Sequence, residues 1–456
     1  MSALGPLREL AAGLRARLAG HPGYLRALVT AYGLMAANVV VQLLLVPLYL
    51  DSLDKYRFGV LMILLAVLGY AAVGMAFMSG GMARILAEHH AREDAQGFRR
   101  AYLVSKLVYV GYAALIGLLV VAVVVVLEGT LFEVRPGYRE TVMWTAAAGG
   151  LYFVLLYDFS VDRLALVAKG HQAVGNLLSI LSLVVFVALV VPWLISGGDL
   201  WGVLACMAAG VAVARIGAWH AWRRLGVDLS WRRGLVGAGG RGGPLRRLVG
   251  RSGLAFTFYG VLLLTLRADI VIVGWLGGAE VAAEFVLVWK IAEVGIDALA
   301  RLPEAFSPYI IHMDARGEAG RLERGYRAGQ RRMWRLALAA GLAYAVLGPW
   351  VVELWVGPEH APQSRLAYVL AGGAVVWLAA ARLPAIYALS MVRLRALMVV
   401  ALVEVAGKLG LTWVLFPWLG YLAPLVAINL VHLAGVAAAY AALRKTIVGD
   451  EAAAAG

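Results

Sequence analysis

The segment Trp289–Arg301, WKIAEVGIDALAR, carries charge within an apolar stretch long enough to cross a membrane. Its charged residues are spaced three, four and four apart, so they lie on one face of a helix: Lys290, Glu293, Asp297 and Arg301. Glu304 extends the same face. Each ionised side chain within a bilayer-spanning segment costs roughly 2.5 kcal/mol or more. This charged face therefore predicts a cavity, a partner or a transport pathway.

The composition around this segment is that of a polytopic membrane protein. Of the 456 residues, 62% are hydrophobic and 15% are charged, and the mean hydropathy is +0.81. A water-soluble core cannot bury so large an apolar fraction. The single cysteine, Cys206, lies in an apolar run, and the eight histidines show no metal-ligand spacing. We therefore expect no metal and no cofactor, apart from a coupling proton or sodium ion.

Apolar runs of about 20 residues predict an all-α protein with about twelve transmembrane helices. The expected spans are Tyr24–Leu50, Phe58–Met82, Tyr102–Leu127, Val142–Ala165, Val174–Ile195, Trp201–Trp219, Leu254–Leu276, Val281–Ile311, Trp334–Val356, Leu366–Leu389, Ala396–Phe416 and Tyr421–Leu443.

Loop charges set the expected orientation. The side that carries both termini holds 29 Lys and Arg residues, and the opposite side holds 5. The positive-inside rule then places both termini in the cytoplasm. The formal net charge of +14 is accounted for by these loops, and no nucleic-acid partner is expected.

The chain is expected to consist of two six-helix lobes. The basic, glycine-rich stretch 220–252 is predicted to be a cytoplasmic linker between an N-terminal lobe, 24–219, and a C-terminal lobe, 253–445. Residues 1–23 form a basic amphipathic segment expected on the inner membrane surface, and 446–456 form a short cytoplasmic tail. Because each lobe has an even number of helices, the repeat must be parallel, related by a pseudo-two-fold axis along the membrane normal.

Intramembrane charges mark the candidate site. Arg267 and Lys290 both lie roughly 14 Å below the outer ends of their spans at about 1.5 Å per residue. One interpretation is that these cations attract an anionic group, while Asp269, Glu293 and Asp297 balance them or carry a coupling proton. The alternative is an ion-pair network that holds two helices together. Arg301 lies near the expected cytoplasmic end of its span.

Further charges in the second lobe extend these alternatives. Glu404 and Lys408 are spaced i, i+4, so they can neutralise each other within one helix, or line the cavity. Arg382 is a cavity cation or reaches the headgroups. His432 is interpreted as a packing residue. In the first lobe, a solvated helix end accounts for three charged residues: Asp158, Asp162 and Arg163.

Four stretches resemble the Wzx-type polysaccharide flippases of the MATE-like (MOP) transporter superfamily. They are LVPLYLDSLDKYRFGVLMILLAV (45–67), GGMARILAEHHAR (80–92), RLALVAKGHQAVGN (163–176) and RADIVIVGWLGGAEVAAEFVLVWKI (267–291). In the last stretch Asp269 matches the acidic position of that family. Lys55 departs from the pattern, since a small residue usually precedes Tyr56. The resemblance implies two lobes in a V and alternating access to a central cationic cavity.

The resemblance also implies a cargo, an oligosaccharide repeat unit on polyprenyl pyrophosphate, moved across the bacterial inner membrane for O-antigen, capsule or exopolysaccharide. The expected partners are this cargo, membrane lipids and other polysaccharide assembly proteins. The expected cavity cations are Arg267, Lys290, Arg301, Arg382 and Lys408, and the coupling or balancing acids are Asp269, Glu293, Asp297 and Glu404.

Two alternatives to a flippase stay open. A cation-coupled small-molecule exporter of the MATE type is disfavoured because the first span, 24–50, contains no acidic residue. A membrane polysaccharide polymerase or glycosyltransferase is disfavoured because outer loops such as 51–57 and 277–280 are too short for a catalytic domain. We therefore expect a transporter and not an enzyme.

Overall fold

The structure, a computed structural model, describes residues 22–71, 82, 85–126, 137–225, 244–304, 306, 310–311, 313–314, 316–391 and 394–433. Side chains are not described for 244–267. Nearly all of the expected surface segment 1–23, the tail 446–456 and residues 226–243 of the expected linker lie outside the described residues.

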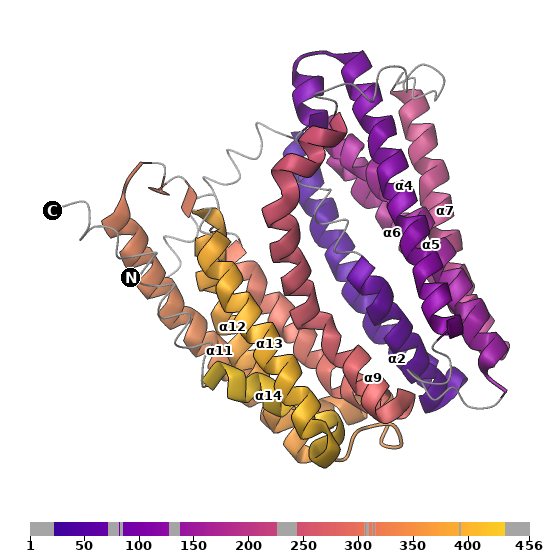
Figure 1. The fold of residues 1–456 in the computed structure, drawn as a ribbon, viewed down its shortest axis with the longest axis vertical. Coiled ribbons are helices and arrows are strands. Elements are labelled where there is room, and N and C mark those ends of the chain that lie inside the picture. The colour runs from indigo at the N-terminus through magenta and orange to yellow at the C-terminus, as the bar shows by residue number, and fades with distance from the viewer. Residues whose placement is uncertain are drawn as a thin grey trace, which may run out of the picture. The chain divides into compact units, whose positions relative to one another are not determined.

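The regular elements of the described residues are all helical (Figure 1). They are α2 (Pro22–Ala71), α4 (Ala95–Val126), α5 (Arg139–Ala168), α6 (Gln172–Ile195), α7 (Leu200–Arg224), α9 (Pro244–Glu304), α11 (Ala319–Val356), α12 (Arg365–Ser390), α13 (Leu394–Leu419), the short 3₁₀ helix η1 (Gly420–Leu422) and α14 (Ala423–Val431). Eight helical stretches are long and apolar enough to cross a membrane. The all-α polytopic fold predicted from the sequence is confirmed.

Sharp turns inside α2 and α9 account for part of the difference between these eight stretches and the twelve expected spans, because each turn joins two expected spans within one stretch. The expected span Val142–Ala165 lies in α5, which is not one of the eight. α2 turns at Asp54 (φ 61°, ψ 166°) and α9 turns at Gly278 (φ 82°, ψ 176°). Both residues have a backbone conformation that is almost exclusive to glycine, and a non-glycine residue there costs of order 1–3 kcal/mol. Asp54 also caps the helix that follows, because its Oδ1 accepts a hydrogen bond from the Arg57 amide at 2.9 Å.

The chain divides into two compact units. Unit 1 comprises Met1–Leu48, Gly74–Val126 and Pro136–Gly253, and unit 2 comprises Tyr49–Val73, Leu127–Arg135 and Leu254–Gly456. One boundary between the units falls between Gly253 and Leu254. The segment Tyr49–Val73, which precedes most of unit 1 in the sequence, groups with unit 2.

Within unit 2, the part of α2 after Asp54 packs closely on α9. A Cβ atom added at Gly59 would lie 1.8 Å from the carbonyl oxygen of Ala279, so only glycine fits there. At the same end, Lys55 Nζ lies 2.5 Å from Glu284 Oε1. The lysine that departs from the family pattern thus has a partner on α9.

The same helix pair occurs in both units, and each helix of one pair is related to its counterpart by a fixed shift in residue number. Before α4, the amides of Glu93, Asp94 and Ala95 donate to carbonyls three, five and two residues earlier, and the amides of 317–319 repeat this pattern before α11. Glu93 and Gly317 both have positive φ, 55° and 68°. A shift of 224 residues therefore relates α4 to α11.

A glycine contact recurs between the paired helices. In unit 1 a Cβ at Gly117 of α4 would lie 3.2 Å from the Gly150 Cα of α5. In unit 2 a Cβ at Gly341 of α11 would lie 2.5 Å from the Gly372 carbonyl oxygen of α12. Small residues at these positions let the backbones approach, as is usual between membrane helices. The pair 150 and 372 also gives a shift of 222 between α5 and α12, which the C-cap residues Lys169 and Met391 share.

Candidate functional site

Among the described residues, charged side chains gather at three places within the long helices. We call the first the Lys106 cluster, which lies in unit 1 and comprises Lys106, Asp158, Asp162 and Arg215. We call the second the α9 stripe, which lies in unit 2 and comprises Lys290, Glu293, Asp297, Arg301 and Glu304. The third, the buried quartet, also lies in unit 2 and comprises Asp269, Glu404, Lys408 and His432.

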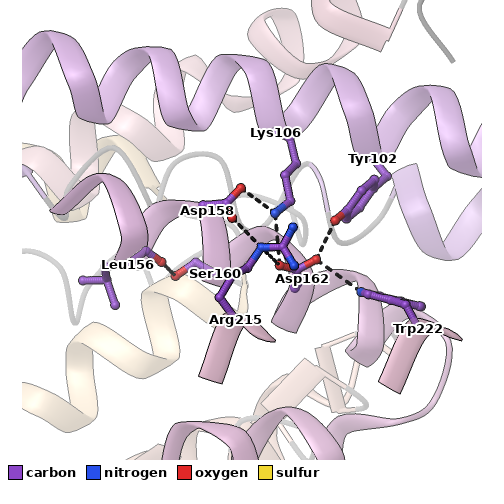
Figure 2. A network of polar contacts seen from close by, with 8 residues as sticks. All are labelled: Tyr102, Lys106, Leu156, Asp158, Ser160, Asp162, Arg215 and Trp222. Atoms are coloured by element: carbon purple, nitrogen blue, oxygen red, sulfur yellow. Dashed lines mark hydrogen bonds and ion pairs between the residues drawn. The ribbon is translucent and has the colours of Figure 1, made fainter. Parts of the chain in front are cut away.

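The Lys106 cluster joins three helices, α4, α5 and α7 (Figure 2). Lys106 Nζ lies 2.5 Å from Asp158 Oδ1 and 3.1 Å from Asp162 Oδ2. Arg215 Nε contacts the same two carboxylates, at 2.5 Å from Asp158 Oδ2 and 3.1 Å from Asp162 Oδ2. Two cations thus neutralise two anions in this cluster.

Asp162 is the centre of this cluster. Its side chain has no exposed area, and Lys106 is 4% exposed. Its Oδ1 also accepts hydrogen bonds from the Tyr102 hydroxyl at 2.5 Å and from the Trp222 indole nitrogen at 3.2 Å. The expectation that Asp162 lies on a solvated helix end is wrong, because four donors from α4 and α7 enclose its carboxylate.

Sequence reasoning missed Lys106 and Arg215. The pairs join residues 52 to 60 positions apart, so no local spacing reveals them. Asp158 and Asp162 lie one helical turn apart and present both carboxylates on one face of α5. The signal that could have found them is that Lys106 and Arg215 each lie in an apolar run with no acidic residue one turn away, whereas Asp158 and Asp162 lie together in another run.

Unit 2 has uncharged residues at the positions equivalent to Lys106, Asp158 and Asp162. The shifts of 224 and 222 relate Lys106 to Gln330, Asp158 to Ala380 and Asp162 to Pro384. Pro384 lacks the amide that would bond to the Ala380 carbonyl four residues earlier. Gln330 Nε2 donates to that carbonyl at 3.0 Å and so replaces the missing hydrogen bond.

The α9 stripe is paired but accessible. Lys290 Nζ lies 3.0 Å from Glu293 Oε2, with side chains 17% and 27% exposed. Arg301 Nη1 lies 2.8 Å from Glu304 Oε2, and both are exposed. Asp297 is also exposed. Charged side chains in a spanning helix are stable at such exposure only beside water or other polar groups.

Arg382 of α12 belongs to the same electrostatic neighbourhood as the stripe. Asp297 interacts with Arg382 as well as with Lys290, Glu293 and Arg301. Five of the nine predicted site residues therefore lie together in unit 2. The side chain of Arg267, which was expected to share the depth of Lys290, lies outside the described residues.

The buried quartet contains three other predicted residues. Lys408 Nζ lies 2.9 Å from Asp269 Oδ2 across two helices, α13 and α9, with side chains 1% and 6% exposed. Glu404 Oε1 lies 3.8 Å from His432 Nε2. Lys408 and Asp269 thus form an ion pair inside unit 2, and the Lys408 ammonium is shielded from solvent.

Comparisons with known proteins identify the fold. No family model and no curated protein matches the sequence. Among solved structures, an inward-facing multidrug resistance MATE family transporter of the MOP superfamily aligns with TM-score 0.71 and 14% identity, covering 92% of this chain and 94% of that one. An outward-facing conformation of such a transporter aligns with TM-score 0.60 and 14% identity, covering 93% and 95%. A point mutant of the Vibrio cholerae MATE transporter VcmN gives 0.57 and 14%, covering 93% and 97%. The chain therefore has the fold of the MATE transporters.

Proposed function

We propose that this chain is an alternating-access transporter that moves an oligosaccharide repeat unit on polyprenyl pyrophosphate from the cytoplasmic to the periplasmic leaflet of a bacterial inner membrane. The product would supply surface polysaccharide. The transport step needs no catalytic residue, since no bond in the cargo is made or broken.

The accessible mixed charge of the α9 stripe is the observation that carries this proposal. A pyrophosphate headgroup with attached sugars must cross about 30 Å of hydrocarbon, which strongly disfavours charged and hydroxyl groups. A polar surface within a spanning segment lowers that cost. Lys290, Arg301 and Arg382 supply charge for phosphate oxygens, and the carboxylates of Glu293 and Asp297 accept hydrogen bonds from sugar hydroxyls.

Ion pairs of this kind can exchange partners without a large change in net charge. When a phosphate oxygen binds Lys290, it replaces Glu293, whose carboxylate becomes available to a sugar. The stripe therefore suits a cargo that is both anionic and rich in hydroxyl groups. Arg301, nearer the cytoplasmic end, is proposed to make the first contact.

The fold supports alternating access as the mechanism. The aligned structures include inward-facing and outward-facing conformations of a MATE transporter. The same likeness favours a second candidate function, a cation-coupled exporter of small molecules, because those relatives are described as multidrug resistance transporters. The two functions differ in the cargo and can be separated by experiment.

The test is complementation of a deletion strain. Loss of the gene should remove surface polysaccharide and accumulate the lipid-linked repeat unit, and the wild-type gene should reverse both effects. Lys290→Glu and Arg267→Glu should fail to complement while the protein stays in the membrane. The matched control is Arg365→Glu, a charge reversal at the exposed first residue of α12, which should complement.

A double exchange, Lys290→Glu with Glu293→Lys, separates cargo binding from helix packing. It preserves the ion pair but moves the cation by about one turn, so stability should be retained and export reduced. Normal polysaccharide in both Lys290→Glu and Arg267→Glu would reject the site. Drug resistance on overexpression, with no polysaccharide defect on deletion, would instead establish the exporter.

A further inference from the structure

The buried quartet of unit 2 has an unbalanced charge. Asp269 and Lys408 form an ion pair 2.9 Å long and cancel each other. Glu404, 7% exposed, is one turn before Lys408 on α13, and its carboxylate faces the imidazole of His432. The formal charges of these four side chains therefore sum to zero only if one further proton is bound to Glu404 or His432.

His432 is buried among groups that come from three helices of unit 2, α9, α12 and α13. The imidazole is 2% exposed, and its Nδ1 lies 2.8 Å from the carbonyl oxygen of Ile428 on the preceding turn. From α12 it meets the uncharged ring of Trp377, with centroids 6.0 Å apart. The charged groups that act on it are Glu404 and Lys408 of α13, and Asp269 of α9 acts through Lys408.

The free side of the imidazole faces the carboxylate. His432 Nε2 is buried and has no hydrogen-bond partner within the described part of the chain, and Glu404 Oε1 is 3.8 Å away. Since Nδ1–H can donate to the Ile428 carbonyl, Nε2 is the nitrogen that accepts or carries the shared proton. A rotamer adjustment of about 1 Å brings the two atoms to hydrogen-bond distance.

A proton fits this site better than a metal cation. Sodium and divalent ions prefer several oxygen ligands, whereas the atoms here are one carboxylate, one imidazole nitrogen and a neighbouring ammonium. The Lys408 ammonium repels a second cation that has a full charge and a finite radius. No group of three or more candidate metal-ligating side chains occurs among the described residues.

We propose that Glu404 and His432 form a proton-binding site inside unit 2, and that this proton is the coupling ion of the transporter. The first part stands on the quartet alone, and the second part rests on the proposed function. With the proton bound, the quartet is neutral. Without it, the quartet carries a net charge of minus one, which favours a conformation that admits water to α13 and α14.

The test begins with the purified full-length protein in lipid nanodiscs without cargo. Raised from about pH 6 to about pH 10, the wild type should release one proton more per chain than Glu404→Gln. His432→Gln should keep the proton on Glu404, so the infrared band of a protonated carboxyl group should be stronger than in the wild type. That band should be missing in Glu404→Gln.

Glu353→Gln is the matched control, because it removes an exposed carboxylate of α11 that is not part of the buried quartet, and its loss should not alter the release. Equal proton release by the wild type and Glu404→Gln would overturn the site. If Glu404→Gln does not fold, the infrared comparison of the wild type with His432→Gln decides, and an unchanged carboxyl band overturns the proposal.

Coupling is tested separately in proteoliposomes with the lipid-linked oligosaccharide. A pH gradient should accelerate wild-type transport several-fold and should not accelerate transport by Glu404→Gln. Equal acceleration of both proteins would overturn the coupling role. Proton release without any oligosaccharide transport would refute the proposed function and leave the proton site intact, so the two failures are distinguishable.

Discussion

The helix pair α4–α5 of unit 1 and the pair α11–α12 of unit 2 share one backbone pattern but fill it with different chemistry. Both begin after the same left-handed turn and both pack through a pair of glycines. At the next equivalent positions, unit 1 has Lys106 with Asp158 and Asp162, and unit 2 has Gln330 with Ala380 and Pro384.

This difference shows that the fold does not require the Lys106 cluster. In unit 2 the equivalent helices pack in the same way, and a single hydrogen bond from the Gln330 side chain to the Ala380 carbonyl stands at this place. The two cations and two acids of this cluster, which packing does not demand, therefore either serve the function or are a neutral replacement. The following predictions distinguish these possibilities by their costs.

The largest effect is expected for Asp162→Ala. It leaves Lys106, which is 4% exposed, with one carboxylate fewer, and it leaves the hydroxyl of Tyr102 without its acceptor. Breaking a buried ion pair from one side costs about 3–5 kcal/mol. Gln330→Ala in unit 2 should cost about 1–3 kcal/mol, because it leaves the Ala380 carbonyl without its hydrogen-bond donor. Thermal unfolding in detergent measures both.

A rescue variant checks the cause of that loss. Adding Lys106→Leu to Asp162→Ala removes the uncompensated cation and leaves the Asp158–Arg215 pair, 2.5 Å long, in place. Most of the lost stability should return. A double variant as unstable as Asp162→Ala would show that packing of the aspartate, and not charge, is responsible.

The second prediction concerns the glycine contacts. Gly341→Ala places a Cβ 2.4 Å from Val376 Cγ2 and 2.5 Å from the Gly372 carbonyl oxygen, so the helices must move apart at a cost of about 1–3 kcal/mol. Gly117→Ala meets the Gly150 Cα at 3.2 Å, which a small shift relieves. We expect a loss below about 1 kcal/mol at Gly117. Equal losses in unfolding experiments would contradict the expected difference between the two contacts.

The third prediction compares the turns before the two helices. Asp94 Oδ1 accepts a hydrogen bond from the Gly97 amide at 2.7 Å, whereas Glu318 at the equivalent position makes no side-chain cap. Asp94→Ala should therefore cost about 0.5–2 kcal/mol, and Glu318→Ala less than about 0.5 kcal/mol. The difference between the variants is measured by unfolding at neutral pH.

The same turn gives a pH dependence. The Gly97 amide and the neighbouring His89 lower the pKa of Asp94 below its ordinary value of 3.8. Because the folded pKa lies below the unfolded one, the stabilisation is complete above about pH 4 and is lost as the pH falls through the lowered value. The stability of the wild type should thus approach that of Asp94→Ala in strong acid, and a constant difference down to about pH 2 would contradict this.

The smallest effect is expected at the left-handed residue of unit 1. Glu93 has φ 55°, and unit 2 places Gly317 there. Glu93→Gly should stabilise by roughly 0.5–1 kcal/mol, since relief of the left-handed strain exceeds the entropy that glycine adds to the unfolded chain. The reverse change, Gly317→Glu, should destabilise by a similar amount. Chemical denaturation of both variants measures the pair.

Much of the fold was predictable because the physical signal is strong. Long apolar runs set the spans, and the α9 stripe was visible because its charges recur at helical spacing within one segment. The turn at Gly278 was signalled by a short glycine-containing loop. The turn at Asp54 was harder to predict, because an aspartate rarely has that conformation.

The Lys106 cluster and the pairing of Lys408 could not be read from local spacing. The i, i+4 spacing of Glu404 and Lys408 suggested a pair within α13, yet the Lys408 ammonium bonds to Asp269 of α9. Such choices depend on which helices meet, and periodicity within one helix does not contain that information. The repeat supplies part of it, because Gly117 and Gly341 fix the equivalent positions from which Lys106 and Gln330 can be compared.

The bond between Gln330 and the Ala380 carbonyl has a mechanical consequence. In α5 the region around Asp162 is held by an unbroken backbone ladder and by four side-chain donors. In α12 the ladder is already interrupted at Pro384, and a flexible side chain bridges the gap. Rotation of the Gln330 side chain would therefore allow α12 to bend at this point. We expect this part of α12 to be more flexible than the equivalent part of α5.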